Sequence, residues 1–341
     1  ALGQYQEAGG TLINQLKNII VKFISAKSVI SGDLTLGMML SVQYIIGQLN
    51  SPVNLIIGFI QQTQDARISL ERLAEIHTKK DEDDPSTPLI TEIPKESGIR
   101  ITDLSFKYEG AGSPTVLNSI NLEIPHGKTT AIVGASGSGK TTLIKLMLGF
   151  YQPLMGKIEI ENTPLTSFSM KEWRRTCGVV MQEGFIFSDT IANNIAPGDE
   201  YVDKAALYKA VSIANISTFI ENLPLSYNTK IGQEGYGTSQ GQKQRILIAR
   251  AVYKDPQFLF FDEATNALDA NNEKVIMENL AEFFKGRTVV VVAHRLSTVR
   301  NADNIVVLDR GRIIEQGTHE ELTEKRGEYY RLVKNQLELG N

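Results

Sequence analysis

Residues 236–263 read YGTSQGQKQRILIARAVYKDPQFLFFDE, and this stretch decides the fold. It contains the continuous apolar run Phe258 to Phe261, which ends in the acidic pair Asp262 and Glu263. An apolar run without alternation is typical of a parallel strand that is buried on both faces. An acidic pair at the end of such a strand can bind Mg²⁺ and orient the water that attacks a phosphate. The stretch therefore indicates an α/β sheet with a nucleotide site at its edge.

A phosphate-binding loop lies upstream of this stretch. Residues 134–141 read GASGSGKT and match the pattern G-x-x-x-x-G-K-[ST], directly after the strand-like segment 129–133 and before a helix that begins near Gly139. Glycines let successive backbone N–H groups close around phosphates, and the helix N-terminus adds positive potential. In this pattern Lys140 reaches the β- and γ-phosphates and Thr141 offers a hydroxyl to Mg²⁺. The loop therefore predicts a nucleotide with Mg²⁺, and this pattern is shared by many unrelated ATPases and GTPases. ATP and Mg²⁺ become the expected cofactors only with the family resemblance described below.

After residue 98 the chain alternates between strand and helix patterns. Residues 99–108 and 120–124 read as antiparallel strands, whereas residues 288–293 form a second continuous apolar run. Residues from 197 to about 223 read mainly as helices between the two nucleotide motifs. His294 follows the second apolar run and could donate a hydrogen bond to a γ-phosphate, although a lone histidine is more often structural. We predict an α/β domain with a mixed sheet over residues 98–338.

The N-terminal part has a different character. No residue from Leu34 through Gln64 is charged, and this run is longer than the roughly 20 residues that span a bilayer. We interpret it as a membrane helix whose polar residues face other helices or a wet cavity. The alternative is a buried helical hairpin of a soluble domain. Residues 11–30 are a weaker candidate, because three lysines point in different directions around a helix: Lys17, Lys22 and Lys27.

The connections complete the predicted organisation. Residues 31–33 (SGD) read as a turn between two antiparallel helices. Beyond residue 64 the pattern becomes amphipathic, and basic residues predict that this end is cytoplasmic: Arg67, Arg72, Lys79 and Lys80. Residues 81–97 are acidic, contain prolines and show no period, as in a linker. We therefore expect a partial transmembrane domain over 1–80, a linker over 81–97 and a nucleotide-binding domain over 98–338.

Composition excludes several classes of protein. With 341 residues, 42% of them hydrophobic, the chain can hold about two domains with a full core. A formal net charge of −4 gives no reason to expect a nucleic-acid partner. The single cysteine, Cys177, cannot form an internal disulfide, which fits a buried thiol in a reducing compartment. No cleavable signal peptide is expected, because residues 1–10 are polar and glycine-rich.

Together these motifs resemble the ATP-binding cassette family. In the family's order and spacing, the chain also carries Gln182 near the end of a strand, TSQGQKQR at 238–245, ALD at 267–269 and AHR at 293–295. The resemblance covers residues 98–338 and implies a cassette with an antiparallel and a helical subdomain that hydrolyses ATP to drive transport. It also implies that two cassettes meet head to tail, each holding ATP between its own phosphate loop and the other's signature. A homodimer is the simplest such pair.

The resemblance implies a role for each matching residue. Tyr108 would stack on adenine, although it could be an ordinary strand aromatic. The phosphate cradle would comprise Gly134, Ser136, Gly137, Ser138, Gly139, Lys140, Thr141 and Thr142. The ligands of Mg²⁺ would be Thr141, Gln182 and Asp262. The catalytic residues would be Glu263 as general base, His294 as γ-phosphate switch and Gln182, which also links the site to the membrane domain.

The signature stretch is where the chain departs from the family. Ser239, Gly241 and Gln242 would contact the partner's γ-phosphate, and Asp269 would cross the interface. The family's usual signature is Leu-Ser-Gly-Gly-Gln, whereas Thr238 and Gln240 stand here in place of its Leu and first Gly. One alternative is therefore a degenerate half that binds ATP without hydrolysing it, against which the intact Glu263 argues. Another is a chromosome-maintenance ATPase, but that class carries long coiled coils instead of an uncharged run.

The segment before the cassette is similar to the last two membrane helices of an exporter. This similarity implies a multi-pass protein of the cell membrane with its cassette in the cytoplasm. The stretches GDLTLG and DEATNALDANNE are similar to bacterial peptide exporters that carry a fused cysteine-peptidase domain, which implies a peptide cargo. A lipid or drug exporter is the alternative. With only two such helices, residues 1–341 are not expected to transport cargo by themselves.

Overall fold

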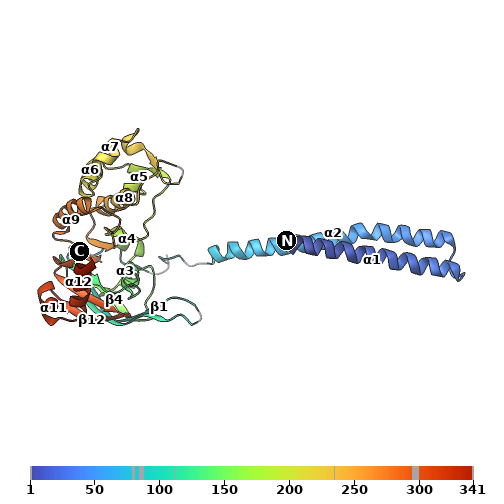
Figure 1. Ribbon diagram of the computed structural model, residues 1–341, viewed down its shortest axis with the longest axis horizontal. Helices are drawn as coiled ribbons and strands as arrows, with labels where there is room; N and C mark the ends of the chain where they lie inside the picture. Colours follow the sequence, from blue (N-terminus) through green and yellow to red (C-terminus); the bar gives the residue numbers. More distant parts are fainter. Residues whose placement is uncertain are drawn as a thin grey trace. The chain divides into compact units, whose positions relative to one another are not determined.

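The computed structural model describes residues 2–78, 81–83, 88–110, 112–233, 235–293 and 299–339, and the chain divides into two compact units, residues 1–81 and 82–341. The first unit is a hairpin of two long antiparallel helices, α1 (Leu2–Ile30) and α2 (Leu36–His77) (Figure 1). The predicted turn joins them, with Gly32 at a φ of 85°. Lys17 Nζ donates a 2.6 Å hydrogen bond to Asn50 Oδ1 and so ties the two helices together.

The uncharged run lies within α2, which continues through Pro52. None of the described helices combines the length and the apolarity that a membrane crossing requires, so the expectation of membrane-spanning helices is not confirmed. Glutamine, asparagine, serine and glycine residues dilute the apolar side chains of the run.

The second unit contains a four-stranded sheet and a six-stranded sheet, and both predicted strand types occur where they were expected. The antiparallel sheet has the order β2-β1-β4-β5: Thr115–Ile124, Ile99–Lys107, Met155–Ile160 and Thr163–Pro164. The six-stranded sheet has the order β12-β11-β3-β10-β9-β6: Arg312–Gly317, Asn304–Asp309, Thr129–Val133, Thr288–Val292, Phe258–Asp262 and Cys177–Val180. All of its pairs are parallel except β11 with β12. This is the mixed α/β architecture that the motifs predict.

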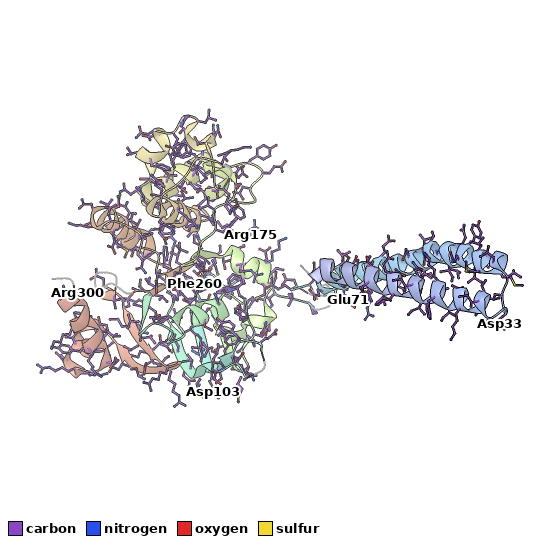
Figure 2. All side chains as sticks on the ribbon, turned by 45° about the vertical axis from the view of Figure 1, so that its right-hand side comes forward. Asp33, Glu71, Asp103, Arg175, Phe260 and Arg300 are labelled. Atoms are coloured by element: carbon purple, nitrogen blue, oxygen red, sulfur yellow. The ribbon has the colours of Figure 1, made fainter. Side chains whose placement is uncertain are left out.

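Helices pack on both faces of the larger sheet. Alternate residues of β9 enter two different cores: Phe258 and Phe260 pack with α3 (Lys140–Met147) and the antiparallel sheet, whereas Leu259 and Phe261 pack with the remaining helices. Those helices are α5 (Ile191–Ile195), α6 (Lys204–Ile213), α7 (Ser217–Glu221), α8 (Gln240–Tyr253), α9 (Ala270–Phe284), α11 (His319–Lys325) and α12 (Glu328–Leu339). Figure 1 shows α5 to α8 grouped at one end of the unit, and Figure 2 shows Phe260 in its interior.

Small elements complete the second unit. Strands β7 (Asp189–Thr190) and β8 (Lys230–Ile231) form a two-stranded ribbon beside α5. Two short 3-10 helices also occur: Leu165–Ser167 follows β5, and Ser226–Asn228 follows α7. Cys177 is buried in β6, where burial raises the pKa of its thiol. A buried and protonated thiol is chemically inert.

The described part of the predicted linker is docked on the second unit. Asp83 accepts hydrogen bonds from Ser169 Oγ (2.5 Å) and Met170 N (2.9 Å) at the start of α4 (Met170–Arg175). Glu82 pairs with Arg174 of the same helix. Farther along, Ile90 forms a bridge with Phe168, Ile93 is buried, and Ser97 O accepts from Thr288 Oγ1. Residues 82–83 and 88–97 are therefore a strap along the cassette, here called the linker strap.

Candidate nucleotide site

Strand order brings the predicted site residues to one edge of the six-stranded sheet. In the central rows, Ile132 of β3 pairs with Val292 of β10, which pairs with Asp262 of β9. Strand β6 continues the same edge, because Val180 pairs with Phe261. Ligands of open parallel sheets bind at the carboxyl ends of the strands. The segments that leave this edge carry Gly134, Glu263 and Gln182; His294 lies outside the described residues.

The phosphate loop has a backbone that only glycine tolerates at its two ends. Gly134 has a φ of 154°, and a Cβ placed there would lie 2.0 Å from Leu308 O. Gly139 is the N-cap of α3 with a φ of 105°, where a Cβ would lie 2.7 Å from Leu117 Cδ2. Between them Ser136 and Gly137 are exposed, whereas Ser138 is buried. The loop thus leads directly into a helix N-terminus, which attracts anions.

The side chain of Lys140 folds back onto the phosphate loop. Its ammonium group donates hydrogen bonds to Gly134 O (3.0 Å) and Ala135 O (2.8 Å) and is almost fully buried. Burial lowers the pKa of Lys140, and the Glu263 and Asp262 carboxylates partly oppose this effect. The lysine is therefore held at the mouth of the loop, where a phosphate can replace the two carbonyl oxygens as its partner.

Asp262 has the environment of a cation ligand. It is fully buried at the end of β9, and neither carboxylate oxygen has a hydrogen-bond partner of normal geometry among the described residues. Burial raises the pKa of the Asp262 carboxyl, with the Thr141 side chain and Lys140 opposing the rise and Glu263 adding to it. A buried carboxylate without donors is costly unless a cation or a new donor satisfies it. Asp262 and Thr141 offer the hard oxygen ligands that Mg²⁺ prefers, so these residues fit the ion.

The described residues hold no cluster of three or more His, Cys, Asp or Glu side chains suited to a metal. Gln182, the third predicted ligand, is exposed after β6.

Glu263 begins a tight turn in a strained conformation. Its φ is 52°, in the left-handed region, and its backbone N–H donates to Val292 O at 3.1 Å. The side chain of Asn266 donates a 2.6 Å hydrogen bond from Nδ2 to Glu263 Oε2. Left-handed non-glycine residues cost free energy and concentrate at functional sites. The strain and the asparagine therefore both fix where this carboxylate lies.

Tyr108 lies beside the phosphate loop in an aromatic cluster. Its hydroxyl is 3.0 Å from Thr142 Oγ1 in α3, and its ring makes edge contacts with Phe106 (5.0 Å between centroids) and Tyr151 (5.3 Å). This position is compatible with a stacked base above the phosphates. Sequence reasoning missed Tyr151, because its segment follows α3 and carries no motif signal.

The signature residues shape the N-terminus of α8. Ser239 is the N-cap and forms a capping box with Gln242: Ser239 Oγ accepts from Gln242 N, and Gln242 Oε1 accepts from Ser239 N. Both side chains thus have a structural role that the pattern S-x-x-Q predicts by itself. A Cβ on Gly241 would lie 3.2 Å from Ala267 O, and Ser239 and Gln240 are exposed. This helix end is therefore open to a second molecule.

Asp269 caps the next helix. Its side chain accepts from Asn272 N (3.0 Å) and Asn272 Nδ2 (2.7 Å) at the start of α9. The hydrogen bonds from Asn272 lower the pKa of Asp269. The exposed N-terminus of α8 at Ser239 lies next to the exposed turn before α9, because Gly241 of α8 packs closely against Ala267 of that turn.

Comparison with known proteins agrees with this geometry. Residues 117–266, which include the phosphate loop and the Asp262–Glu263 pair, match the ABC transporter family. Residues 117–266 form an ABC transporter domain. The chain is 40% identical to the leukotoxin export ATP-binding protein LtxB of Aggregatibacter actinomycetemcomitans, over 93% of this chain and 44% of that protein. It is 39% identical to the leukotoxin translocation ATP-binding protein LktB of Mannheimia haemolytica, over 98% of this chain and 46% of that protein.

A solved structure gives the same relationship in three dimensions. A bacterial Atm1-family ABC exporter with ATP bound matches the chain with a TM-score of 0.74 and 31% identity, covering 98% of this chain and 59% of that one. The chain spans less than half the length of these two curated relatives.

Proposed function

We propose that this chain is the ATP-hydrolysing part of an ABC exporter, and that ATP binding and hydrolysis drive the export of a polypeptide. The observation that supports this most is Asp262, a buried carboxylate at the sheet edge beside Lys140 and Thr141 that has no hydrogen-bond partner of normal geometry among the residues described. A site of this kind fits Mg²⁺ with the phosphates of a nucleotide.

In this proposal each residue acts on ATP in a defined way. Backbone N–H groups of the loop 134–142 bind the phosphates, and Lys140 exchanges its two carbonyl partners for phosphate oxygens. Asp262, Thr141 and Gln182 hold Mg²⁺, which neutralises charge on the phosphates when it is bound. Glu263 accepts a proton from the attacking water, and His294 and Tyr108 bind the γ-phosphate and the adenine.

The partner in this proposal is a second cassette, most simply a copy of the same chain. Ser239, Gly241 and Gln242 would approach the partner's γ-phosphate from the exposed N-terminus of α8, whose 14-residue helix adds positive potential. Asp269 would contact the partner from the start of α9. Thr238 and Gln240 leave this helix end capped, so the departure from the usual signature is compatible with binding.

The hairpin α1–α2 would belong to the membrane part of the exporter, in a multi-pass protein of the cell membrane with its cassette in the cytoplasm. Large apolar side chains are exposed on both helices, among them Phe23 (70%) and Phe59 (69%). An apolar surface of this extent needs cover from other helices or from lipid. The Lys17–Asn50 hydrogen bond resembles the polar contacts that join helices in a bundle.

The cargo assignment rests on the relatives. LtxB and LktB are named for the export and translocation of a leukotoxin. We therefore propose a polypeptide as cargo, a broader class than the peptide expected from the sequence.

Phosphate release from the purified full-length protein tests the proposal. We expect Mg²⁺-dependent hydrolysis by the wild type and a loss of about 10²–10³-fold in kcat for Glu263→Gln, with ATP still bound. Size-exclusion chromatography with light scattering should show an ATP-dependent dimer of Glu263→Gln. A wild type that binds ATP without hydrolysing it would identify the chain as a degenerate half, and full activity of Glu263→Gln would refute the role of Glu263.

A further inference from the structure

Asn266 lies three residues after Glu263, on the turn that leads from β9 to α9. Its Nδ2 donates to Glu263 Oε2 at 2.6 Å, and its backbone N–H donates to Glu263 O at 3.3 Å. The same residue thus closes the turn twice, once through the backbone and once through the side chain. Of these two hydrogen bonds from Asn266, only the side-chain bond is made to the carboxylate of Glu263.

The turn that carries Asn266 is anchored at both ends. Glu263 N binds Val292 O of the neighbouring strand, and Leu268, which is buried, donates from its N–H to Thr265 O at 3.1 Å. Asp269 then caps α9. Because the backbone is fixed by these contacts, the asparagine side chain is presented to Glu263 from a rigid base.

The charge and chemistry of the pair favour a positioning role. A carboxylate accepts strong hydrogen bonds from amide donors. Because such a bond already holds the Glu263 side chain in one rotamer, this side chain loses less conformational entropy when it binds a water molecule. A general base must stay within hydrogen-bond reach of the proton that it accepts, and small displacements cost large factors in rate. Asn266 is exposed, so its substitution disturbs little packing.

We infer that Asn266 is a positioning residue for Glu263, which holds the carboxylate of the general base through Nδ2 in the orientation that catalysis requires. This inference rests on the proposed function, since it assumes that Glu263 is the base. It goes beyond that function because it assigns Asn266 a specific task in the reaction, which is to orient Glu263.

Steady-state ATP hydrolysis by the full-length protein tests the inference. We expect Asn266→Ala to lower kcat by about tenfold and to leave KM for ATP within about twofold, because the lost bond concerns the base and not the nucleotide. Asn266→Asp removes the donor and adds a negative charge beside Glu263, so its kcat should fall further. Asn266→Gln keeps the amide donor and should recover part of the rate. Asn222→Ala, an exposed asparagine after α7, is the matched control and should behave like the wild type.

A double-mutant cycle separates this inference from the proposed function. In the Glu263→Gln background, Asn266→Ala should have no further effect on the residual rate, because the two residues act as one unit. If wild-type protein hydrolyses ATP and Glu263→Gln lowers kcat as expected, yet Asn266→Ala keeps the full kcat, the inference is wrong while the proposed function stands. If Glu263→Gln itself keeps the rate, the proposed function fails first. Equal additional losses in both backgrounds, or a loss of folded protein that accounts for the rate, would also overturn the positioning role.

Discussion

Asp262 and Glu263 are neighbours in the chain but have opposite environments. Asp262 belongs to a strand and is fully buried, and its oxygens have no hydrogen-bond partner of normal geometry within the described part of the chain, whereas Glu263 turns away from the strand at a φ of 52° and is partly exposed. The reversal of the backbone at one residue separates the proposed cation ligand from a group that can reach water. The same principle operates in the phosphate loop, where glycine conformations bring backbone N–H groups together.

Gly134→Ala tests this requirement at a single residue. The new Cβ would lie 2.0 Å from Leu308 O in a backbone at φ 154°, so the loop must move or unfold locally. We expect destabilisation by about 1–3 kcal/mol and loss of ATP binding, measured by thermal unfolding and by a fluorescent ATP analogue. Gly286→Ala is the matched control, because Gly286 also has a positive φ (75°) but open space around it. Normal ATP binding by Gly134→Ala would contradict the predicted geometry of the cradle.

At the scale of elements, the proposed nucleotide site is built around helix N-termini. Helix α3, the proposed phosphate site, has no side-chain cap, whereas α8 carries a complete capping box and α9 is capped by Asp269. A cap satisfies backbone donors that would otherwise be lost, and an uncapped end leaves its donors for a ligand. Ser239 therefore combines a structural duty in α8 with the proposed contact to a partner's phosphate.

Two substitutions of Ser239 distinguish these duties. Ser239→Ala removes the oxygen that accepts from Gln242 N and should lower the free energy of unfolding by about 1 kcal/mol, whereas Ser239→Asp keeps a good cap. We expect Ser239→Asp to fold like the wild type but to lose ATPase activity, because its charge would face a γ-phosphate. The matched control is Thr318→Asp in the capping box of α11, where stability and activity should both persist. Normal hydrolysis by Ser239→Asp would argue against a signature contact.

At the scale of the whole molecule, the boundary between the two compact units lies at residues 81 and 82. The linker strap therefore belongs with the cassette, held by Asp83 at α4, by the buried Ile93 and by Gln257, whose Nε2 donates to Pro94 O at 2.7 Å. Hydrogen bonds from Ser169 and Met170 lower the pKa of Asp83, so this anchor is present at neutral pH and is lost only in acid.

Truncation tests how much the strap contributes to the cassette. A fragment of residues 98–341 should be less stable than one of residues 82–341 by about 2 kcal/mol or more, because the burial of Ile93 alone accounts for about 1.5–3 kcal/mol. Urea unfolding at pH 7 measures the difference. A fragment of residues 88–341 separates the Glu82 and Asp83 anchors from the apolar part of the strap. Equal stability of all three fragments would show that the strap adds nothing.

Sequence by itself determined the α/β fold, the phosphate loop, the buried strands and the family, because these depend on local patterns: glycine spacing, continuous apolar runs and an acidic pair at a strand end. It did not reveal the 2.6 Å bond from Asn266 to Glu263, the aromatic contact of Tyr151 with Tyr108 or the docking of Asp83 on α4. The capping box of Ser239 and Gln242 does have a local signal, the pattern S-x-x-Q. Only the tertiary structure decided the contacts of Asn266, Tyr151 and Asp83, because these depend on the strand order or on backbone angles that no short-range pattern encodes.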